Sequence, residues 1–336
     1  MSNPFRFTIV GSGNISRTYV MALERVANAE LAAMVSRSLN RPEFLPDHVQ
    51  VFRSMEEVDV PFDAVILATP NGMHHDGAVA AAKQGKHVLT EKVLEITTTK
   101  MDSMIAACEA AGVSLAVTYQ RRMSPDNVAV KELLDSGQLG CVFAVDLRVK
   151  FYRDQAYYDS AEYRGGYAID GGGPFMQQAA HNVDVYCWLF GIPDQVVSML
   201  DTFLHDIEVE DHGVALMHHV NGMIGTITAS TCTQPGFAPC LEIHSDRGSI
   251  VMENDNIVFW SIDGVPNPAA RDDFEVHSGA DSAAVDDTAG HEAILSDFAE
   301  SVRENRAPAV PATSARLATD LILKIYEADL LRQSKS

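Results

Sequence analysis

The sequence predicts an α/β protein with two parts, an N-terminal doubly wound parallel sheet and a C-terminal α+β domain with an open, mainly antiparallel sheet. Two observations lead to this fold class. Over residues 1–120, apolar runs of strand length alternate with helix-like segments, as in βαβ units. From residue 121 onward, the segments become longer and alternate apolar with polar residues, which is typical of a sheet with one covered face.

The first domain, residues 1–120, is expected to contain five strands and three helices. The strands are Phe5–Val10, Leu31–Val35, Ala64–Ala68, His87–Leu89 and Val113–Thr118. The helices are Ile15–Val26, Gly77–Gln84 and Thr98–Ala111. In such a sheet, ligands bind beyond the carboxyl ends of the strands, where the strand order reverses.

The second domain, residues 121–336, is expected to contain helices over Pro125–Asp135 and Pro174–Phe190. Strands are expected within 141–151, 210–220 and 223–232, with hairpin turns at 220–223 and 245–249. An acidic loop over 263–288 leads to two amphipathic helices, 291–305 and 312–332. Packing of the last helix, 312–332, back on the first domain is left open.

Composition excludes several classes of protein. With 25 basic and 46 acidic residues, the net charge of −21 argues against nucleic acid or an anionic membrane as partner. The start of the chain lacks the apolar segment of a signal peptide, and no run is long enough to span a bilayer. Five cysteines without CxxC spacing indicate reduced thiols in a cytoplasmic protein. The pairs His74–His75 and His218–His219 lack further ligands, so no metal site is expected.

A glycine-rich turn follows the first strand. It reads Gly11-Ser12-Gly13-Asn14-Ile15, with Ser16 at the third position of a GxGxxG pattern. Such a turn lets backbone N–H groups and a helix N-terminus approach a pyrophosphate. The sequence therefore predicts a dinucleotide-binding domain of Rossmann type.

The end of the second strand carries Ser36 and Arg37, with Arg41 shortly after, where NAD-binding proteins normally have an acidic residue. A hydroxyl and a guanidinium suit the 2′-phosphate of NADP(H), which a carboxylate would repel. NADP(H) is therefore favoured and NAD(H) is the alternative. The alternative is that Arg37 is an ordinary surface arginine that binds no ligand.

Two further turns follow strands at the same edge of the predicted sheet. Thr69, Pro70 and Asn71 are expected near the nicotinamide half of the cofactor, with His74 as a cap or ligand contact. Lys92 follows the strand 87–89 directly. It has three interpretations: a solvated surface charge, a structural ion pair, or an ammonium delivered to a ligand.

The helix predicted over 174–190 carries a histidine that can act as a base. Gln177, His181 and Asp184 are spaced to share one face. A histidine titrates near neutrality and can accept a hydroxyl proton as hydride leaves the carbon. A buried structural histidine is the alternative, but the Gly171-Gly172-Gly173 triplet before the helix favours the functional one.

These motifs together resemble the Gfo/Idh/MocA oxidoreductases, NAD(P)-dependent enzymes of sugars, inositols and sugar derivatives. The similarity continues through Gly85–Val88, Glu91-Lys92, Gln120-Arg121-Arg122 and the glycine triplet with His181 and Asp184. Segments around 120–140, 157–165 and 170–184 look most like dehydrogenases that oxidise the 3-hydroxyl of UDP-N-acetylglucosamine derivatives.

The resemblance implies roles for individual residues. Lys92 would contact the reacting hydroxyl and stabilise developing alkoxide, and His181 would accept the proton. Glu91, Lys92 and Gln120 would belong to the cofactor site. The substrate would be held by Lys92, Arg121, Tyr163, Arg164, Gln177 and His181, with Gln120 a further candidate. Three residues depart from the family pattern: Val93 replaces a proline, Gln177 replaces Asp or Asn, and Ser16 replaces glycine or alanine.

The expected function is hydride transfer between a nicotinamide cofactor and a secondary hydroxyl or ketone of a sugar, cyclic polyol or nucleotide sugar. One alternative is a non-catalytic NAD(P)-binding sensor or regulatory protein on the same fold, and imine or biliverdin-type reduction is a weaker one. An open sheet leaves an apolar face that usually needs a partner. A homodimer or homotetramer through the C-terminal sheet is therefore expected.

Overall fold

The computed structural model describes residues 3–269 and 288–334. By its internal contacts the chain divides into two units: Met1–Gln120 with Ala283–Arg316, and Arg121–Ser282 with Leu317–Ser336. The sequence assigned residues 288–316 to the second domain, but they belong to the first unit. The reason is packing by α7 (Ala289–Glu304), whose Phe298 ring lies 6.4 Å from Phe5 and 6.2 Å from Phe7, between ring centroids.

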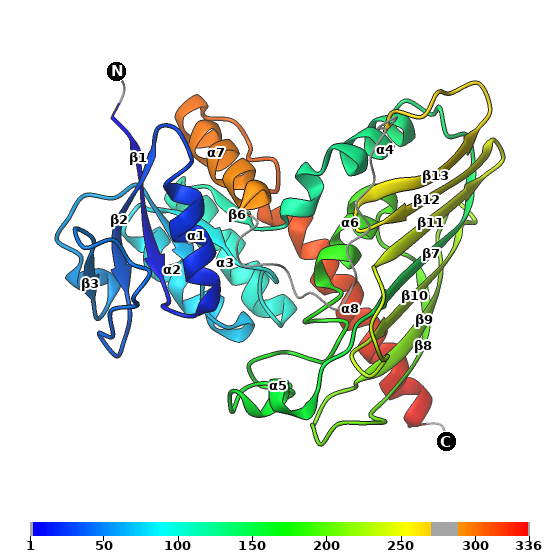
Figure 1. The fold of residues 1–336 in the computed structure, drawn as a ribbon, viewed down its shortest axis with the longest axis horizontal. Helices are drawn as coiled ribbons and strands as arrows, with labels where there is room; N and C mark the ends of the chain where they lie inside the picture. Colours follow the sequence, from blue (N-terminus) through cyan, green and yellow to red (C-terminus); the bar gives the residue numbers. More distant parts are fainter. Residues whose placement is uncertain (1–2, 270–287, 335–336) are drawn as a thin grey trace. The chain divides into compact units, whose positions relative to one another are not determined.

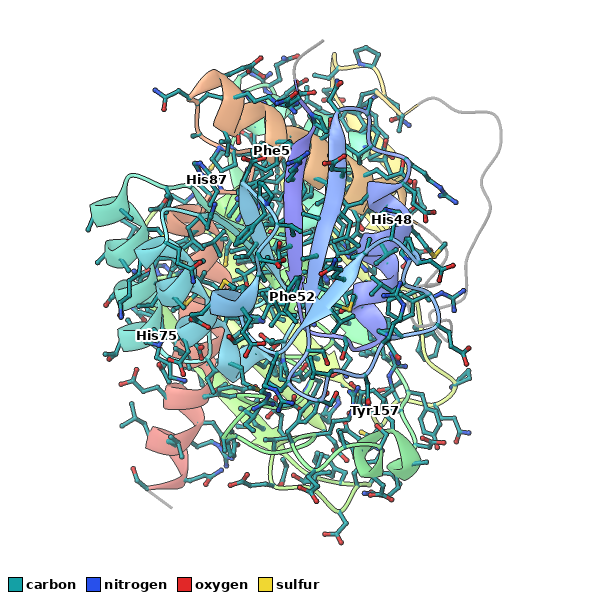
Figure 2. All side chains as sticks on the ribbon, turned by 90° about the vertical axis from the view of Figure 1, so that its left-hand side faces the viewer. Phe5, His48, Phe52, His75, His87 and Tyr157 are labelled. Carbon is teal, nitrogen blue, oxygen red and sulfur yellow. The ribbon has the colours of Figure 1, made fainter. Side chains whose placement is uncertain are left out.

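The first unit is built on a six-stranded parallel sheet in the order β3-β2-β1-β4-β5-β6 (Figure 1). Its strands are β1 (Phe5–Val10), β2 (Ala29–Val35), β3 (Gln50–Phe52), β4 (Ala64–Leu67), β5 (His87–Thr90) and β6 (Leu115–Val117). In Figure 2, Phe5 and His87 mark the amino ends of β1 and β5, while Phe52 marks the carboxyl end of β3. The strand order reverses between β1 and β4, so the doubly wound sheet is confirmed.

Strand β3 was not predicted, because it has three residues and only Val51 and Phe52 are apolar. The helices of the first unit are α1 (Asn14–Leu23), α2 (His74–Lys83), α3 (Thr98–Ala111) and α7, with short 3₁₀ turns at Met55–Glu57, Asn71–Met73 and, at the unit boundary, Gln120–Met123. Helix α3 has the bounds predicted from sequence because clear signals mark both ends. The Thr97 hydroxyl accepts from Lys100 N, and Gly112 ends the helix at φ +67°.

The second unit is built on a seven-stranded sheet in the order β13-β12-β11-β7-β10-β9-β8. Its strands are β7 (Val142–Lys150), β8 (Gln195–Asp201), β9 (His212–His218), β10 (Ile224–Ser230), β11 (Cys240–Ser245), β12 (Gly248–Glu253) and β13 (Asn256–Ile262). Every neighbouring pair is antiparallel except β7 and β10. The predicted open, mainly antiparallel sheet is confirmed.

The helices of this unit are α4 (Pro125–Asp135), α5 (Gln155–Asp159), α6 (Ala180–Phe190) and, from residue 317 onward, α8 (Ala312–Gln333). Helices α6 and α8 lie on one face of the sheet (Figure 1). The Ser198 hydroxyl donates to Ile325 O at 2.6 Å and Leu200 N donates to Asp329 Oδ1 at 3.1 Å. These bonds tie α8 to β8, so most of this helix packs on the second unit's own sheet.

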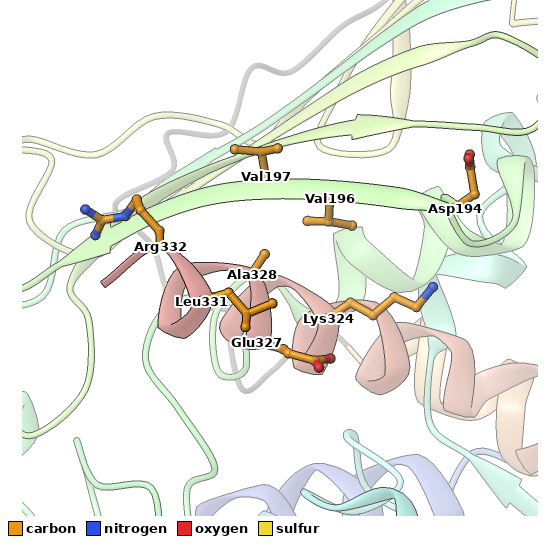
Figure 3. Close-up of a pocket in the computed structure, with 8 residues that line it drawn as sticks. All are labelled: Asp194, Val196, Val197, Lys324, Glu327, Ala328, Leu331 and Arg332. Carbon is orange, nitrogen blue, oxygen red and sulfur yellow. The ribbon is translucent and has the colours of Figure 1, made fainter. Parts of the chain in front are cut away.

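On the opposite face of this sheet, β8 and β9 carry exposed apolar side chains, namely Val197, Met199, Val214 and Leu216. Figure 3 shows the alternation on β8, where Val196 points toward α8 and Val197 points away. A groove of about 480 Å³ lies between α8 and this edge strand, lined by Asp194, Val196, Val197, Lys324, Glu327, Ala328, Leu331 and Arg332. The predicted acidic loop over 263–288 falls mostly on residues 270–287, which lie outside the described ranges.

Candidate functional site

The two glycines of the turn after β1 differ in what surrounds them. Gly11 has φ +118°, and a Cβ there would lie 2.4 Å from Ala68 O, at the carboxyl end of β4. The fold itself therefore requires glycine at position 11. A Cβ on Gly13 would meet no atom of the described residues within 4 Å. The glycine at position 13 thus leaves space that the described residues do not fill, as close approach of a ligand to the backbone requires.

Helix α1 presents an N-terminus suited to an anion. Gly13 is its N-cap, no side chain caps it, and its first turn, which begins Asn14-Ile15, has no acidic residue. The positive end of the helix dipole and the first N–H groups are therefore not neutralised by a side chain. Ser16 is fully buried and donates its hydroxyl to Gly11 O at 3.0 Å, which explains how serine is accommodated at the third position. The loop fits the pyrophosphate of a dinucleotide.

Hydroxyl groups gather at the carboxyl ends of β1 and β2. Ser36 Oγ lies 3.0 Å from Ser12 Oγ and 3.2 Å from Ser38 Oγ. Arg37 beside them is exposed and forms no hydrogen bond or ion pair with the described residues. Arg41 differs, because its guanidinium donates to the carbonyls of Val49, Leu45 and Pro46 and shapes the loop. Of the two predicted arginines, Arg37 is the one available to a ligand.

The turn after β4 is held by a buried histidine. His74 is fully buried, with Nδ1 2.8 Å from Val93 O and Nε2 2.9 Å from Thr69 O. Its ring therefore links the Thr69-Pro70-Asn71 turn to the turn that carries Lys92. Thr69 Oγ1 is buried without a hydrogen-bond partner among residues 3–269 and 288–334. A cofactor amide could satisfy this hydroxyl.

Glu91, the residue before Lys92, belongs to a buried hydrogen-bond network. Glu91 is 8% exposed, and its Oε1 accepts from the Tyr19 hydroxyl at 2.7 Å. Thr118 Oγ1 also lies 2.7 Å from Tyr19 Oη, and since a hydroxyl has one proton, Thr118 is the donor of that bond. Burial, together with the nearby Glu91, raises the pKa of Tyr19 well above its ordinary value. Glu91 Oε2 accepts from Lys92 N at 3.2 Å.

These contacts fix the backbone of the turn at Lys92. The Lys92–Val93 peptide bond is cis, and the Lys92 side chain is half-buried. Tyr19 and Thr118 lie 72 and 27 residues from Glu91 along the chain, and sequence reasoning missed both. No local pattern links them.

Glu95 is another buried acid that sequence reasoning missed. It is fully buried and accepts from Ile96 N at 2.9 Å and from His75 N, in the first turn of α2, at 3.1 Å. Lys100 Nζ lies 3.6 Å from its Oε1. Glu95 thus caps α2 and holds the 92–97 segment against it. A lone acid in the apolar stretch Val93–Ile96 was the signal for it.

In the second unit, the helix that carries His181 begins later than predicted. Residues 174–179 form irregular turns, in which Ala179 N donates to Pro174 O at 2.8 Å, and α6 starts at Ala180. Half-buried His181 therefore lies in the first turn of α6. Gln177 precedes the helix, and its amide donates to Asp170 O at 2.8 Å.

Asp184 was predicted to share a helix face with His181. Its carboxylate forms an ion pair with an arginine, Arg122. Arg122 Nε and Nη2 donate to its two oxygens at 2.7 and 2.6 Å, and both side chains are buried. Burial raises the pKa of Asp184 to about 6, against the hydrogen bond and charge of Arg122, which lower it. This pair anchors α6 to the segment after residue 120.

The glycine triplet packs against the protein itself. A Cβ on Gly173 would lie 1.9 Å from Glu210 O, and one on Gly172 would lie 2.0 Å from Tyr326 Oη. The Glu210 carboxyl accepts from Gly173 N at 3.1 Å and from the Tyr326 hydroxyl at 3.0 Å. Burial raises the pKa of Glu210 to about 7, against these hydrogen bonds. The triplet is required by packing before His181, and Glu210 was not foreseen.

The remaining predicted residues are Gln120 in the first unit and Arg121, Tyr163 and Arg164 in the second. Gln120 Oε1, in the first unit, is buried without a partner among the described residues. Arg121 pairs with Asp255 at 2.9 Å. The Arg164 guanidinium carbon lies 4.4 Å from the ring centroid of Tyr157 and 5.8 Å from that of Tyr163. Tyr157 was not predicted.

Within the described part of the chain, no group of three or more His, Cys, Asp or Glu side chains is placed to hold a metal ion. None of the helices in these ranges is both long enough and apolar enough to cross a membrane.

Comparison with known proteins assigns a family to both halves of the chain. Residues 5–119 match the model described as "Oxidoreductase family, NAD-binding Rossmann fold". Residues 127–251 match "GFO/IDH/MocA C-terminal domain". Together the two matches cover more than two thirds of the chain.

Relatives with names point to the same chemistry. Inositol 2-dehydrogenase of Rhizobium meliloti is 24% identical over 80% of this chain and 82% of its own. The WlbA dehydrogenase from Bordetella pertussis, solved with NADH and UDP-GlcNAcA, is 28% identical with a TM-score of 0.85 over 98% of this chain and 97% of its own. The WlbA dehydrogenase from Chromobacterium violaceum is 26% identical, with a TM-score of 0.84 over 98% and 95%.

Because these relatives are named as dehydrogenases, they do not favour the non-catalytic alternative. The glycine loop, the uncapped α1 terminus and the unpartnered Thr69 and Gln120 oxygens fit a nicotinamide dinucleotide. The chain belongs to the Gfo/Idh/MocA family and is an NAD(P)-dependent oxidoreductase that acts on the CH–OH groups of sugars, polyols or nucleotide sugars.

Proposed function

We propose that this enzyme is an NADP(H)-dependent dehydrogenase that oxidises a ring hydroxyl of a UDP-linked N-acetylhexosamine derivative. The observation that carries the substrate class is the similarity to two WlbA dehydrogenases solved with UDP-GlcNAcA, which extends over 98% of the chain. The 3-hydroxyl is the position that the family subgroup implies. Myo-inositol and simple sugars, for which other relatives are named, are the second candidates.

In this proposal Lys92 and His181 are the catalytic residues. The ammonium of Lys92 lies against the reacting hydroxyl, where a positive charge stabilises the alkoxide that develops. His181 accepts the hydroxyl proton. The nicotinamide ring, when bound, supplies the hydride acceptor. The Glu91–Tyr19–Thr118 network supports this assignment because it fixes the backbone from which Lys92 extends.

Gln177 cannot replace a carboxylate as base, since an amide does not accept a proton at neutral pH. Its amide group is held by Asp170 O. In this proposal Gln177 positions the sugar by hydrogen bonding, and proton transfer depends on His181 alone. Tyr163, Arg164 and Arg121 hold the rest of the substrate, although Arg121 is already paired with Asp255 and contributes least.

The cofactor is held by Gly11–Ile15 at the pyrophosphate and by Thr69, Pro70, Asn71 and Gln120 nearer the nicotinamide. His74 and Glu91 support these turns. The preference for NADP(H) rests on the Ser12–Ser36–Ser38 hydroxyl cluster and the unpaired Arg37, which suit a 2′-phosphate better than a free 2′-hydroxyl.

The enzyme is proposed to be a homodimer or homotetramer through the open face of the second sheet. Val197 pairs with Leu216 across β8 and β9, and Met199 pairs with Val214. These four side chains are 41–65% exposed and form one apolar patch. A patch of this kind usually marks an interface. Met199→Glu should yield a smaller species by light scattering, and Val220→Glu, on the exposed 220–223 turn, should not.

We also propose a cytoplasmic location, since all five cysteines are free.

The test is turnover by the purified chain. Reduced cofactor is measured with NADP⁺ and, in turn, UDP-GlcNAcA, UDP-N-acetylglucosamine and myo-inositol. We expect the highest kcat/KM with a UDP sugar. Lys92→Ala and His181→Ala should each lower kcat by roughly a hundredfold or more while NADPH still binds. Turnover of inositol alone would refute the substrate class, and undiminished turnover by Lys92→Ala would refute its role.

A further inference from the structure

Two arginines of the second unit lie around one tyrosine ring. Tyr157 belongs to α5 (Figure 2), and its ring centroid lies 4.4 Å from Cζ of Arg164 and 5.4 Å from Cζ of Arg153. Neither guanidinium forms an ion pair with a carboxylate of the described residues. Arg164 Nε is buried without a hydrogen-bond partner in these ranges, and the side chain of Arg153 donates only to Tyr152 O, at 2.8 Å.

The Tyr157 residue is held in place by several hydrogen bonds around it. Asp154 Oδ1 accepts from Tyr157 N at 3.0 Å, and Gln178 Nε2 donates to the Tyr157 hydroxyl at 3.2 Å. The carbonyl of Arg153 accepts from His205 Nε2 at 2.8 Å. Gln178 lies three residues before His181, in the segment that leads into α6. The cluster is therefore a built feature that is connected to the start of the His181 helix.

Most other arginines of this unit have a carboxylate partner. Arg122 pairs with Asp184 and Arg148 pairs with Glu242. The chain has 46 acidic residues, so a counter-charge would be easy to supply. Two positive groups close to one ring repel each other, and an anion near both of them offsets that repulsion. Their lack of a protein partner indicates that the anion comes from a ligand.

We propose that Arg153 and Arg164, stacked on Tyr157, bind an oxyanion of the sugar substrate, either the carboxylate of a hexuronate or the diphosphate of a nucleotide sugar. This inference rests on the proposed function and names the charge that its substrate must carry. The planar guanidinium fork matches both oxyanions bidentately, and stacking on an aromatic ring fixes its plane. Arg153 and Tyr157 are thereby added to the substrate residues named above.

The test is calorimetric titration of the full chain with UDP, UDP-N-acetylglucosamine and UDP-GlcNAcA. Arg164→Ala and Arg153→Ala should each raise the Kd roughly ten- to a hundredfold for the probes that carry the recognised oxyanion. A loss shared by all three probes assigns the diphosphate. A loss confined to UDP-GlcNAcA assigns the carboxylate. Arg247→Ala, an exposed arginine of the β11–β12 hairpin, is the matched control and should leave every Kd unchanged.

Arg164→Lys keeps the charge without the planar fork, so it decides the matter if Arg164→Ala does not fold. It should still weaken binding severalfold. A wild-type chain that binds none of the probes, or Arg153→Ala and Arg164→Lys with unchanged Kd values, overturns the inference. Failure of the proposed function can be distinguished from failure of this inference. Arginine-dependent binding of UDP without turnover of any UDP sugar would remove the dehydrogenase assignment and leave the oxyanion site.

Discussion

The two glycine motifs of this chain look alike in sequence but serve opposite purposes. At Gly13 the space beside Cα is left open by the described residues, whereas at Gly172 and Gly173 it is filled by Tyr326 and Glu210. Gly13 leaves space that a ligand can enter, whereas Gly172 and Gly173 leave space that the protein itself fills. A glycine cluster beside a candidate catalytic residue is therefore not in itself evidence for a binding site. The atoms that surround the position of the missing Cβ decide whether a glycine serves ligand binding or packing.

The sharpest test of this contrast is Gly173→Ala. The added Cβ would lie 1.9 Å from Glu210 O, a backbone atom that cannot move aside without shifting β9. We expect a loss of roughly 4 kcal/mol in the free energy of unfolding, measured by urea denaturation. Gly166→Ala is the control, because its nearest neighbour is the flexible end of Glu208 at 3.2 Å. A Gly173→Ala protein as stable as the control would contradict the packing role of the triplet.

The second prediction concerns the carboxyl that holds the triplet. Burial raises the pKa of Glu210 from 4.5 to about 7 in the folded protein. Between these values the unfolded chain has lost this proton and the folded chain still holds it, so stability falls as pH rises from about 4.5 to 7. Glu210→Gln resembles the protonated form and lacks this dependence. From pH 5 to pH 8 the variant should gain on the order of 3 kcal/mol relative to wild type.

Urea denaturation of both proteins at the two pH values measures this difference. Other titrating groups are common to both and cancel. Glu208→Gln, an exposed glutamate two residues away, should show no such gain. A gap between wild type and Glu210→Gln that stays constant with pH would mean that Glu210 remains ionised in the folded state.

At the other motif, Gly13→Ala should separate binding from stability. A Cβ there meets no described atom within 4 Å, so the free energy of unfolding should change by less than about 1 kcal/mol. The methyl group would occupy the space that a pyrophosphate needs, and NADPH affinity should fall roughly ten- to a hundredfold. Fluorescence titration and thermal unfolding measure the two effects. Lost stability with normal cofactor affinity would show that Gly13 is a structural glycine after all.

The difference between local signals and long-range contacts explains which features could be predicted from the sequence. The parallel sheet and the glycine loop were predictable because apolar runs and turn residues are local signals, and helix α3 carries caps at both ends. The placement of α7 on the first unit was not, because it depends on Phe298 meeting Phe5 and Phe7 nearly 300 residues away. Glu210 and Tyr326 were missed for the same reason.

The late start of α6 has a different cause. The sequence between Gly173 and Ala180 contains no helix breaker after Pro174, so a continuous helix was the natural expectation. Packing of the triplet on Glu210 and Tyr326 forces the entering chain into irregular turns instead. Tertiary contacts overrode local propensity at the segment that delivers Gln177 and His181.

The smallest expected effect compares two arginines four residues apart. Arg37 is unpaired among the described residues, while Arg41 donates to the carbonyls of Leu45, Pro46 and Val49. Arg37→Ala should weaken NADPH binding roughly tenfold and leave NADH binding and stability unchanged, since only NADPH carries the 2′-phosphate. Arg41→Ala should instead lower stability by about 1–2 kcal/mol and affect both cofactors alike. If Arg37→Ala weakens both cofactors equally, Arg37 contacts the shared part of the dinucleotide, and the argument from Ser36 and Arg37 for NADP(H) fails.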